Sequence, residues 1–239
     1  MVKINGKWAA SYIQKMIIPD FEGFSMVVTK RLLPTFDTVG TEALKHGEEW
    51  FRGKAAGIDP LDNDQYDDAA YFADKAMDKT LAFADMLVAM YFASVGLYSV
   101  GLFHLFEQHV ADLFLEIFEV HTYRKEVKLK EVADWLKADV SIDVTAFKTW
   151  PVVDELRLVA NTIKHAEGGS ARALRGCRPD LFIPPADRER GGGPTIPFQS
   201  RVRKPLFGED LYLTTDDFSR YVEGVITFWS ELADAMAKH

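Results

Sequence analysis

The sequence predicts an all-α protein, and three observations lead to that prediction. Residues 69–137 contain no proline and are rich in good helix formers. Residues 151–169 carry apolar side chains at helical spacing, with polar side chains between them. Thr215 or Asp216 suits a helix N-cap, and a third amphipathic pattern follows it. We therefore expect a bundle of four or five helices.

The chain is expected to divide near residues 57–68, a polar and acidic segment. Residues 1–60 are assigned to an N-terminal extension, and residues 61–239 to the helical domain. Proline and glycine interrupt residues 184–205 so often that we expect a long, basic, irregular loop there. Residues 211–214 are expected to form a short strand.

The chain has a formal net charge of −8, but this charge is unevenly distributed. Residues 157–205 contain ten Lys or Arg side chains against four acidic ones. An excess of cations in one segment is typical of an anion-binding face, for example for RNA phosphates. A solvated basic loop is the alternative interpretation.

Cellular location can be argued from one cysteine and one apolar segment. Cys177 is the single cysteine, which fits a reducing compartment, and no secretory signal is visible, so we expect a cytoplasmic protein. Residues 86–106 carry no charged Asp, Glu, Lys or Arg, which meets the length criterion for a membrane span. We favour a buried bundle helix and no membrane partner, because no Lys/Arg cluster flanks the segment. Gly96 and Gly101 mark either a close approach of helices or a break between two helices.

The strongest chemical signal lies in the helix expected at residues 151–169. Pro151 suits the first turn of a helix, and Gly168 with Gly169 suits a left-handed stop. Arg157, Asn161 and His165 follow one another in steps of four residues, so they form one slowly winding polar row. An arginine, an amide and an imidazole on one face can bind a phosphate and transfer a proton, although a solvated helix edge has the same appearance.

Further side chains are candidates to assist this polar row. Glu107 follows the apolar segment and would hold Arg157 in place if the two helices pack together. Four cations are expected to bind flanking phosphates: Lys164, Arg172, Arg175 and Arg178. We expect no metal and no cofactor, because the histidines lack metal-binding spacing and no glycine-rich phosphate loop is present.

Two segments together resemble the HEPN superfamily of small helical-bundle domains. They are YSVGLFHLFEQHVADLF at residues 98–114 and VVDELRLVANTIKHAEGG at residues 152–169. The resemblance implies a metal-independent endoribonuclease of the toxin or phage-defence type, in which a ribose 2′-OH attacks the neighbouring phosphate. It implies that His165 acts as general acid or base, that Arg157 stabilises the charge on the phosphorane, and that Asn161 orients His165 or a phosphate oxygen.

The resemblance leaves two functions open. Seven residues separate Arg157 from His165, whereas the family has four to six, and Leu158 rather than a polar residue follows the arginine. The alternative to a ribonuclease is therefore a non-catalytic module that binds a partner protein or a nucleotide. The expected partners are RNA, a partner or antitoxin protein, and a second copy of the chain.

A homodimer is expected because the polar row offers a single titratable group, and a two-fold axis would supply a second His165. The helix at residues 151–169 would lie near that axis. Four aromatic residues would provide its apolar area unless they belong to the core: Phe103, Phe106, Phe147 and Trp150.

Overall fold

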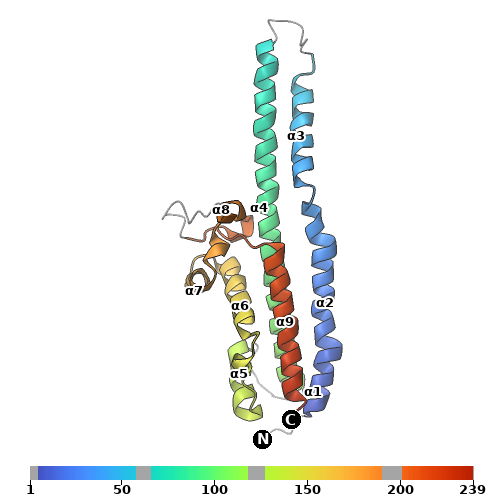
Figure 1. Ribbon diagram of the computed structural model, residues 1–239, viewed down its shortest axis with the longest axis vertical. Helices are drawn as coiled ribbons and strands as arrows, with labels where there is room; N and C mark the ends of the chain where they lie inside the picture. The colour runs from blue at the N-terminus through green and yellow to red at the C-terminus, as the bar shows by residue number, and fades with distance from the viewer. Residues whose placement is uncertain (1–4, 58–65, 118–126, 190–200, 239) are drawn as a thin grey trace.

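The computed structural model describes residues 5–57, 66–117, 127–189 and 201–238, and every regular element in these ranges is helical (Figure 1). The expectation of an all-α protein is confirmed. The strand expected at residues 211–214 is wrong, because this segment has no partner strand among the described residues. Tyr212 donates one backbone hydrogen bond to the carbonyl of Leu181, and the segment otherwise connects helices.

Nine α-helices are described. In chain order they are α1 (Gly6–Tyr12), α2 (Ile18–Val27), α3 (Val39–Lys54), α4 (Tyr66–Asp112), α5 (Leu129–Trp135), α6 (Trp150–His165), α7 (Gly169–Cys177), α8 (Pro185–Glu189) and α9 (Thr215–Met236). Shorter turns of π or 3₁₀ type extend or link them: η1 (Ile13–Ile17), η2 (Val28–Leu32), η3 (Leu33–Phe36), η4 (Leu113–Ile117), η5 (Leu136–Val140), η6 (Val144–Ala146), η7 (Pro179–Phe182) and η9 (Pro205–Phe207).

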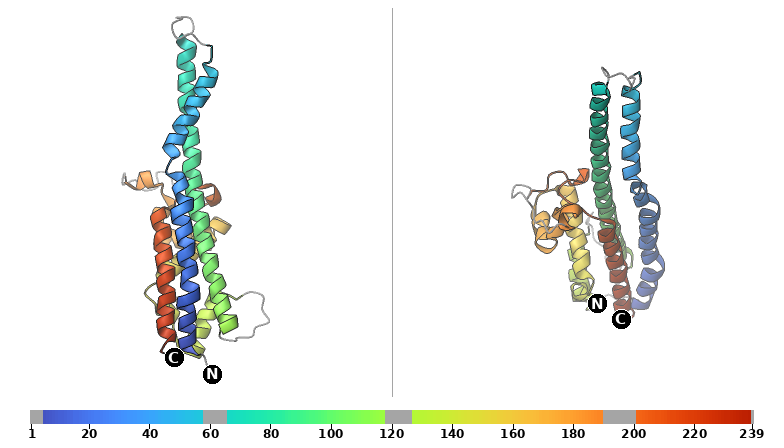
Figure 2. Two further views of the ribbon diagram at one scale, coloured as in Figure 1. Left: turned by 90° about the vertical axis from the view of Figure 1, so that its right-hand side faces the viewer. Right: turned by 45° about the horizontal axis from the view of Figure 1, so that its top comes forward.

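The bundle is organised around α9, which α1 and α2 flank on one side and α4 and α6 on the other (Figures 1 and 2). A capping box begins this helix: Thr214 accepts a hydrogen bond from the N–H of Asp217, whose carboxylate accepts one from the N–H of Thr214. Phe218 and Trp229 are completely buried. Burial of such large side chains stabilises a fold by about 1.5–3 kcal/mol each.

Residues 9–33 contribute several side chains to this core. Ile13, Ile17 and Phe21 are at most 1% exposed, and they pack in the same apolar cluster as the inner face of α9. The ring of Phe21 lies 6.4 Å from the ring of Trp229. The segment expected as an N-terminal extension therefore supplies part of the main hydrophobic core.

The long helix α4 runs without a break through both of its central glycines. A Cβ atom on Gly96 would lie 3.2 Å from Cδ1 of Ile163 on α6, and one on Gly101 would lie 3.4 Å from the ring of Phe24 on α2. Of the two alternatives, close approach of helices is therefore the one that the structure shows.

The helix α4 with its extension is also long and apolar enough, by length and composition, to cross a membrane. Its most apolar window has a mean hydropathy of 1.8, and 33% of that window is buried within the protein. A core helix of a soluble protein meets the same criterion, so this property alone does not decide between the two interpretations.

The α3 helix and the first half of α4 form a two-helix hairpin that extends beyond the rest of the molecule (Figures 1 and 2). We call α3 together with residues 66–90 the arm. The ring of His46 stacks on Phe83 at 4.4 Å, and Trp50 meets Phe72 edge-on. Gly47 is required at the crossing, because a Cβ atom there would overlap the hydroxyl of Thr80.

Candidate functional site

The helix α6 has the expected start but a different end. Pro151 lies in its first turn, and Leu156, Val159 and Ile163 are buried against the bundle. The helix ends at Ala166, which adopts φ 56° and ψ −135°, a conformation that disfavours any residue with a Cβ atom. Gly168 and Gly169 do not form the stop: the first is extended and the second begins α7.

Arg157 is held by an acidic residue of its own helix. Its Nε donates a hydrogen bond of 2.8 Å to Oδ1 of Asp154, one turn earlier. Neither Nη atom of Arg157 has a hydrogen-bond partner among the described residues. The guanidinium is thus oriented through one edge, while its other edge remains open to a ligand.

The other members of the polar row have no polar partner in the described part of the chain. Asn161 is half-buried, and His165 is exposed at the C-terminal end of α6. Lys164 is exposed beside His165. No hydrogen bond or ion pair to a described residue occupies these three side chains.

Glu107 and Arg157 have different partners, although α4 and α6 pack together. The carboxylate of Glu107 lies 3.9 Å from Nδ1 of His104 on its own helix. Asp154 takes the role that we expected for Glu107, since it holds the guanidinium of Arg157.

The three arginines of the α7 region have three different environments. Arg172 is exposed and forms no ion pair with a described residue. Arg175 donates a hydrogen bond of 2.8 Å to Glu167 and stacks over the ring of Phe182. This hydrogen bond lowers the pKa of the Glu167 carboxyl. Of the three, Arg172 is the one with a free guanidinium.

Arg178 is the centre of an intramolecular ion network. Its guanidinium donates hydrogen bonds to Asp180 through Nε and Nη2, and further ones to Glu155 on α6 and Asp217 on α9, each of the latter at 2.7 Å. The hydrogen bond to Asp180 is the main cause that raises the pKa of Arg178, and the same bond lowers the pKa of Asp180. Arg178 therefore joins α6, α7 and α9.

Two more side chains complete this network, and both bind the Oε1 atom of Glu155. Tyr221 donates its hydroxyl at 2.6 Å, and Arg220 donates Nη2 to the same oxygen. Burial, together with the negative charge of Glu155, raises the pKa of Tyr221. We call these six residues the Arg178 network: Glu155, Arg178, Asp180, Asp217, Arg220 and Tyr221.

The expected role of Arg178 and the observed one differ because its partners are distant in the sequence. Glu155 lies near the start of α6 and Asp217 in the first turn of α9, two positions that acidic residues commonly occupy for local reasons, so neither indicates an ion pair from the sequence alone. The sequence contains one indication of an ion pair at this place: Arg220 lies on an amphipathic helix, one residue before a core tyrosine. Three acidic groups already surround Arg178, so it has little capacity to bind a phosphate.

The four aromatic residues considered for a dimer interface belong to the core. Phe103 and Phe106 are at most 2% exposed. Phe147 and Trp150 are half-buried and pack against the ring of Phe228. An interface near α6 would have to use other side chains.

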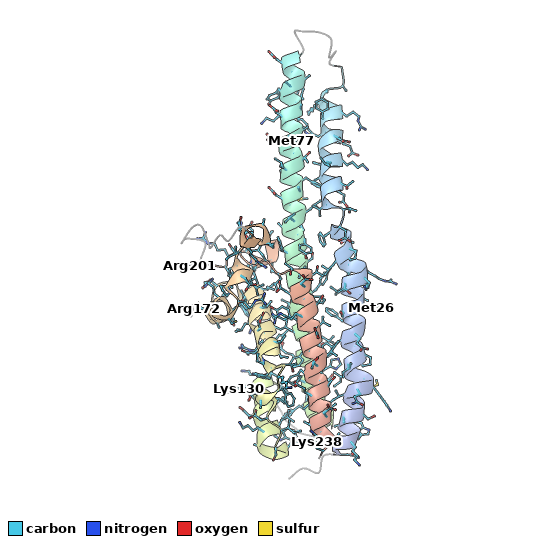
Figure 3. The ribbon with its side chains drawn as sticks, in the orientation of Figure 1. Met26, Met77, Lys130, Arg172, Arg201 and Lys238 are labelled. Carbon is cyan, nitrogen blue, oxygen red and sulfur yellow. The ribbon has the colours of Figure 1, made fainter. Side chains whose placement is uncertain are left out.

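Free cations nevertheless gather around α6 and α7. Five exposed side chains form no ion pair with any described residue: Lys164, Arg172, Arg201, Arg203 and Lys204. Figure 3 shows Arg172 and Arg201 on the same outer side of the molecule. Part of the expected basic loop, residues 190–200, lies outside the described residues.

The described residues form no metal centre, and the cavity at the start of α9 lies away from the polar row. Among the described residues no group of three His, Cys, Asp or Glu side chains could hold a metal ion. A cavity of about 450 Å³ lies between η3, α4 and the start of α9, and its walls include none of the predicted site residues. Within the polar row, His165 is exposed, and Arg157 and Asn161 are half-buried.

Comparison with known proteins adds no relative. No family model, no curated protein and no solved structure matches this chain.

Proposed function

We propose that the chain is a HEPN-like domain that binds RNA and cleaves it without a metal ion when two copies bring their polar rows together. The observation that supports this proposal most directly is the group of five unpaired cations around α6 and α7, next to the polar row. Unpaired Lys and Arg side chains on one face attract the phosphates of RNA. An imidazole can act as a general acid or base, and His165 lies within the same region.

The arrangement of Arg157 supports the same proposal. Asp154 holds the guanidinium through Nε, which leaves both Nη groups without a described partner. A planar edge of two N–H groups matches two oxygens of a phosphate. In this mechanism, Arg157 stabilises the charge of the phosphorane, and Asn161 orients the phosphate or the imidazole.

A second copy completes the chemistry. Cleavage by a ribose 2′-OH requires one group to remove a proton and another to donate one to the leaving oxygen. Each chain offers one exposed histidine in its polar row, so two chains related by a two-fold axis supply both groups. Light scattering at tens of micromolar protein should show a dimer, and a strict monomer would contradict this arrangement.

Labelled RNA in the presence of EDTA tests the cleavage itself. His165→Ala should lower the cleavage rate by about 10²–10⁴-fold, the usual contribution of a general acid or base. His104→Ala is the matched control, because His104 is also an exposed histidine but lies outside the polar row. Equal cleavage by wild type and His165→Ala, or cleavage that EDTA abolishes, would rule out this mechanism.

The second candidate function is a non-catalytic module that binds a partner protein or a nucleotide. The observation in its favour is that His165 is exposed and that the cavity between η3, α4 and the start of α9 has no side chain of the polar row in its walls. In that case RNA or nucleotide binding would depend on salt concentration and on Lys164 and Arg172, with no cleavage product at any time. Cleavage that depends on His165 would exclude this alternative.

A further inference from the structure

One face of α4 is covered by α9 in the bundle and continues uncovered onto the arm. Val95, Leu102 and Phe106 are buried on this face, and Phe106 packs against Trp229 of α9. Toward the tip of the arm, apolar side chains continue at the same spacing of three or four residues: Val88, Ala84, Leu81 and Met77. Figure 3 shows Met77 above the level at which α9 begins.

The uncovered part of this face is strongly exposed. Met77 is 58% exposed, Leu81 57% and Val88 43%. The neighbouring helix α3 adds Leu44, which is 59% exposed. Single exposed apolar side chains are common, but a row that continues a core face is typical of a binding surface.

A groove runs between the two helices of the arm along this face. One cavity in it, of about 260 Å³, is lined by Leu44 and Phe51 of α3 and by Ala73 and Met77 of α4, among others. At the base of the arm, Val88 and Leu33 line the cavity of about 450 Å³, and Thr215, the first residue of α9, lines it as well. A helix that lies in this groove would therefore continue the line of α9.

The edges of the groove are acidic. On α4, four aspartates repeat at positions that turn to the same side of the helix, next to the apolar row and away from α3. They are Asp67, Asp74, Asp78 and Asp85, and all are exposed. On α3, Glu48 lines the groove itself. The one ion pair of these residues in the described chain joins Asp78 to Lys75 on the same helix.

We propose that the arm binds a basic amphipathic helix of a partner protein, in the groove between α3 and α4 and in line with α9. The apolar side of that helix would cover Met77, Leu81 and Leu44, as α9 covers the same face of α4 in the bundle. Its Lys or Arg side chains would face the aspartate row. The 16 residues of α3 span about 24 Å, so a partner helix of four to five turns fills the groove.

A second copy of the chain fits the groove less well. Two arms can pair face to face around a two-fold axis in two ways. If α4 of one copy lay beside α3 of the other, the arms would run parallel and the two α9 helices would collide. The pairing that remains is antiparallel and places α4 of one copy beside α4 of the other. The aspartate rows of both copies would then line one seam, and like charges in such a position repel each other. A basic partner removes this repulsion.

Two 18-residue peptides test the proposal: a fluorescent helix of Leu and Lys with apolar residues at heptad spacing, and its counterpart with Glu in place of every Lys. Fluorescence anisotropy with the full-length chain should show binding of the Lys peptide that is at least tenfold tighter than binding of the Glu peptide. Met77→Ser with Leu81→Ser should weaken binding of the Lys peptide at least tenfold. Asp74→Lys with Asp85→Lys should do the same.

Two matched controls separate this groove from general attraction to an acidic protein. Met86→Ser with Met90→Ser removes exposed apolar side chains from the opposite face of α4. Glu223→Lys with Asp234→Lys reverses two exposed charges on α9. Both double variants should bind the Lys peptide as the wild type does. Equal affinity for the two peptides, or equal weakening by the controls, would overturn the proposal. So would a dimer in light scattering that dissociates on Leu81→Ser, since a second copy would then occupy the groove.

Discussion

Glu155 of α6 and Arg178, which follows α7, form a salt bridge of 2.7 Å. The same carboxylate oxygen of Glu155 also accepts hydrogen bonds from Tyr221 and Arg220 of α9. One carboxylate thus accepts hydrogen bonds from three side chains of two other parts of the chain. Such a network fixes how α7 is placed relative to α6, and therefore where the free cation of Arg172 lies relative to His165. The first predictions concern this network.

Arg178→Ala should destabilise the protein by about 2–3 kcal/mol, because it leaves the largely buried Asp217 without a cation and Glu155 with Arg220 as its remaining cation. Urea unfolding followed by circular dichroism measures this change. Arg172→Ala is the control, since Arg172 is exposed and unpaired, and it should change stability by less than about 0.5 kcal/mol. Equal stability of the two variants would show that the network contributes little.

The free energy of unfolding should decrease at both acidic and alkaline pH. The pKa values of Asp180 and Glu167 are lowered by hydrogen bonds from Arg178 and Arg175, so these carboxylates stabilise the fold above their unfolded pKa of about 4. This contribution is lost as the pH falls below that value. The pKa of Tyr221 is raised, so its contribution is present below its unfolded pKa of about 10 and is lost as the pH rises beyond it.

Urea midpoints between pH 2 and pH 11 check both limits. Tyr221→Phe should flatten the alkaline decline and leave the acidic one unchanged, whereas Asp180→Asn should flatten part of the acidic decline. An alkaline decline as steep in Tyr221→Phe as in the wild type would mean that another group causes it.

The network also shows what could be predicted from the sequence and what could not. The apolar spacing of α6 and α9 is local, so it identified both helices and their buried faces. Two partners of Arg178, Glu155 and Asp217, lie 23 and 39 residues away, and a local pattern contains no information about them. The excess of cations was therefore visible in the sequence, but the distinction between the paired Arg178 and the free Arg172 was not.

The arm illustrates the same limit for the fold. Apolar residues recur on one face of α4 on both sides of Tyr91, so their local spacing does not distinguish the covered part of this face from the uncovered part. The cover of that face comes from α9, more than a hundred residues later, and α9 begins beside Tyr91, whose hydroxyl accepts a hydrogen bond from the N–H of Thr215. Only the position of α9 shows where the covered part ends.

The long apolar helix leads to a prediction on solubility. Because α2, α6 and α9 pack against the lower half of α4, we expect the protein to remain in the soluble fraction without detergent after centrifugation of lysed cells. The double variant Leu81→Ser with Met77→Ser should leave this distribution unchanged. Recovery of the wild type in the membrane pellet, with release by detergent alone, would instead support a membrane-spanning α4.

The end of α6 offers a test of local backbone strain. Ala166 adopts φ 56° and ψ −135°, which glycine adopts freely and alanine does not. Ala166→Gly should stabilise the protein by about 1 kcal/mol, because the strain it relieves exceeds the extra chain entropy of glycine in the unfolded state. Ala173→Gly, at an exposed position within α7, should instead destabilise by up to about 1 kcal/mol, because it lowers helix propensity without relieving strain. The unfolding temperatures of both variants, compared with that of the wild type, test this prediction. A loss of stability in Ala166→Gly would show that this turn carries no strain.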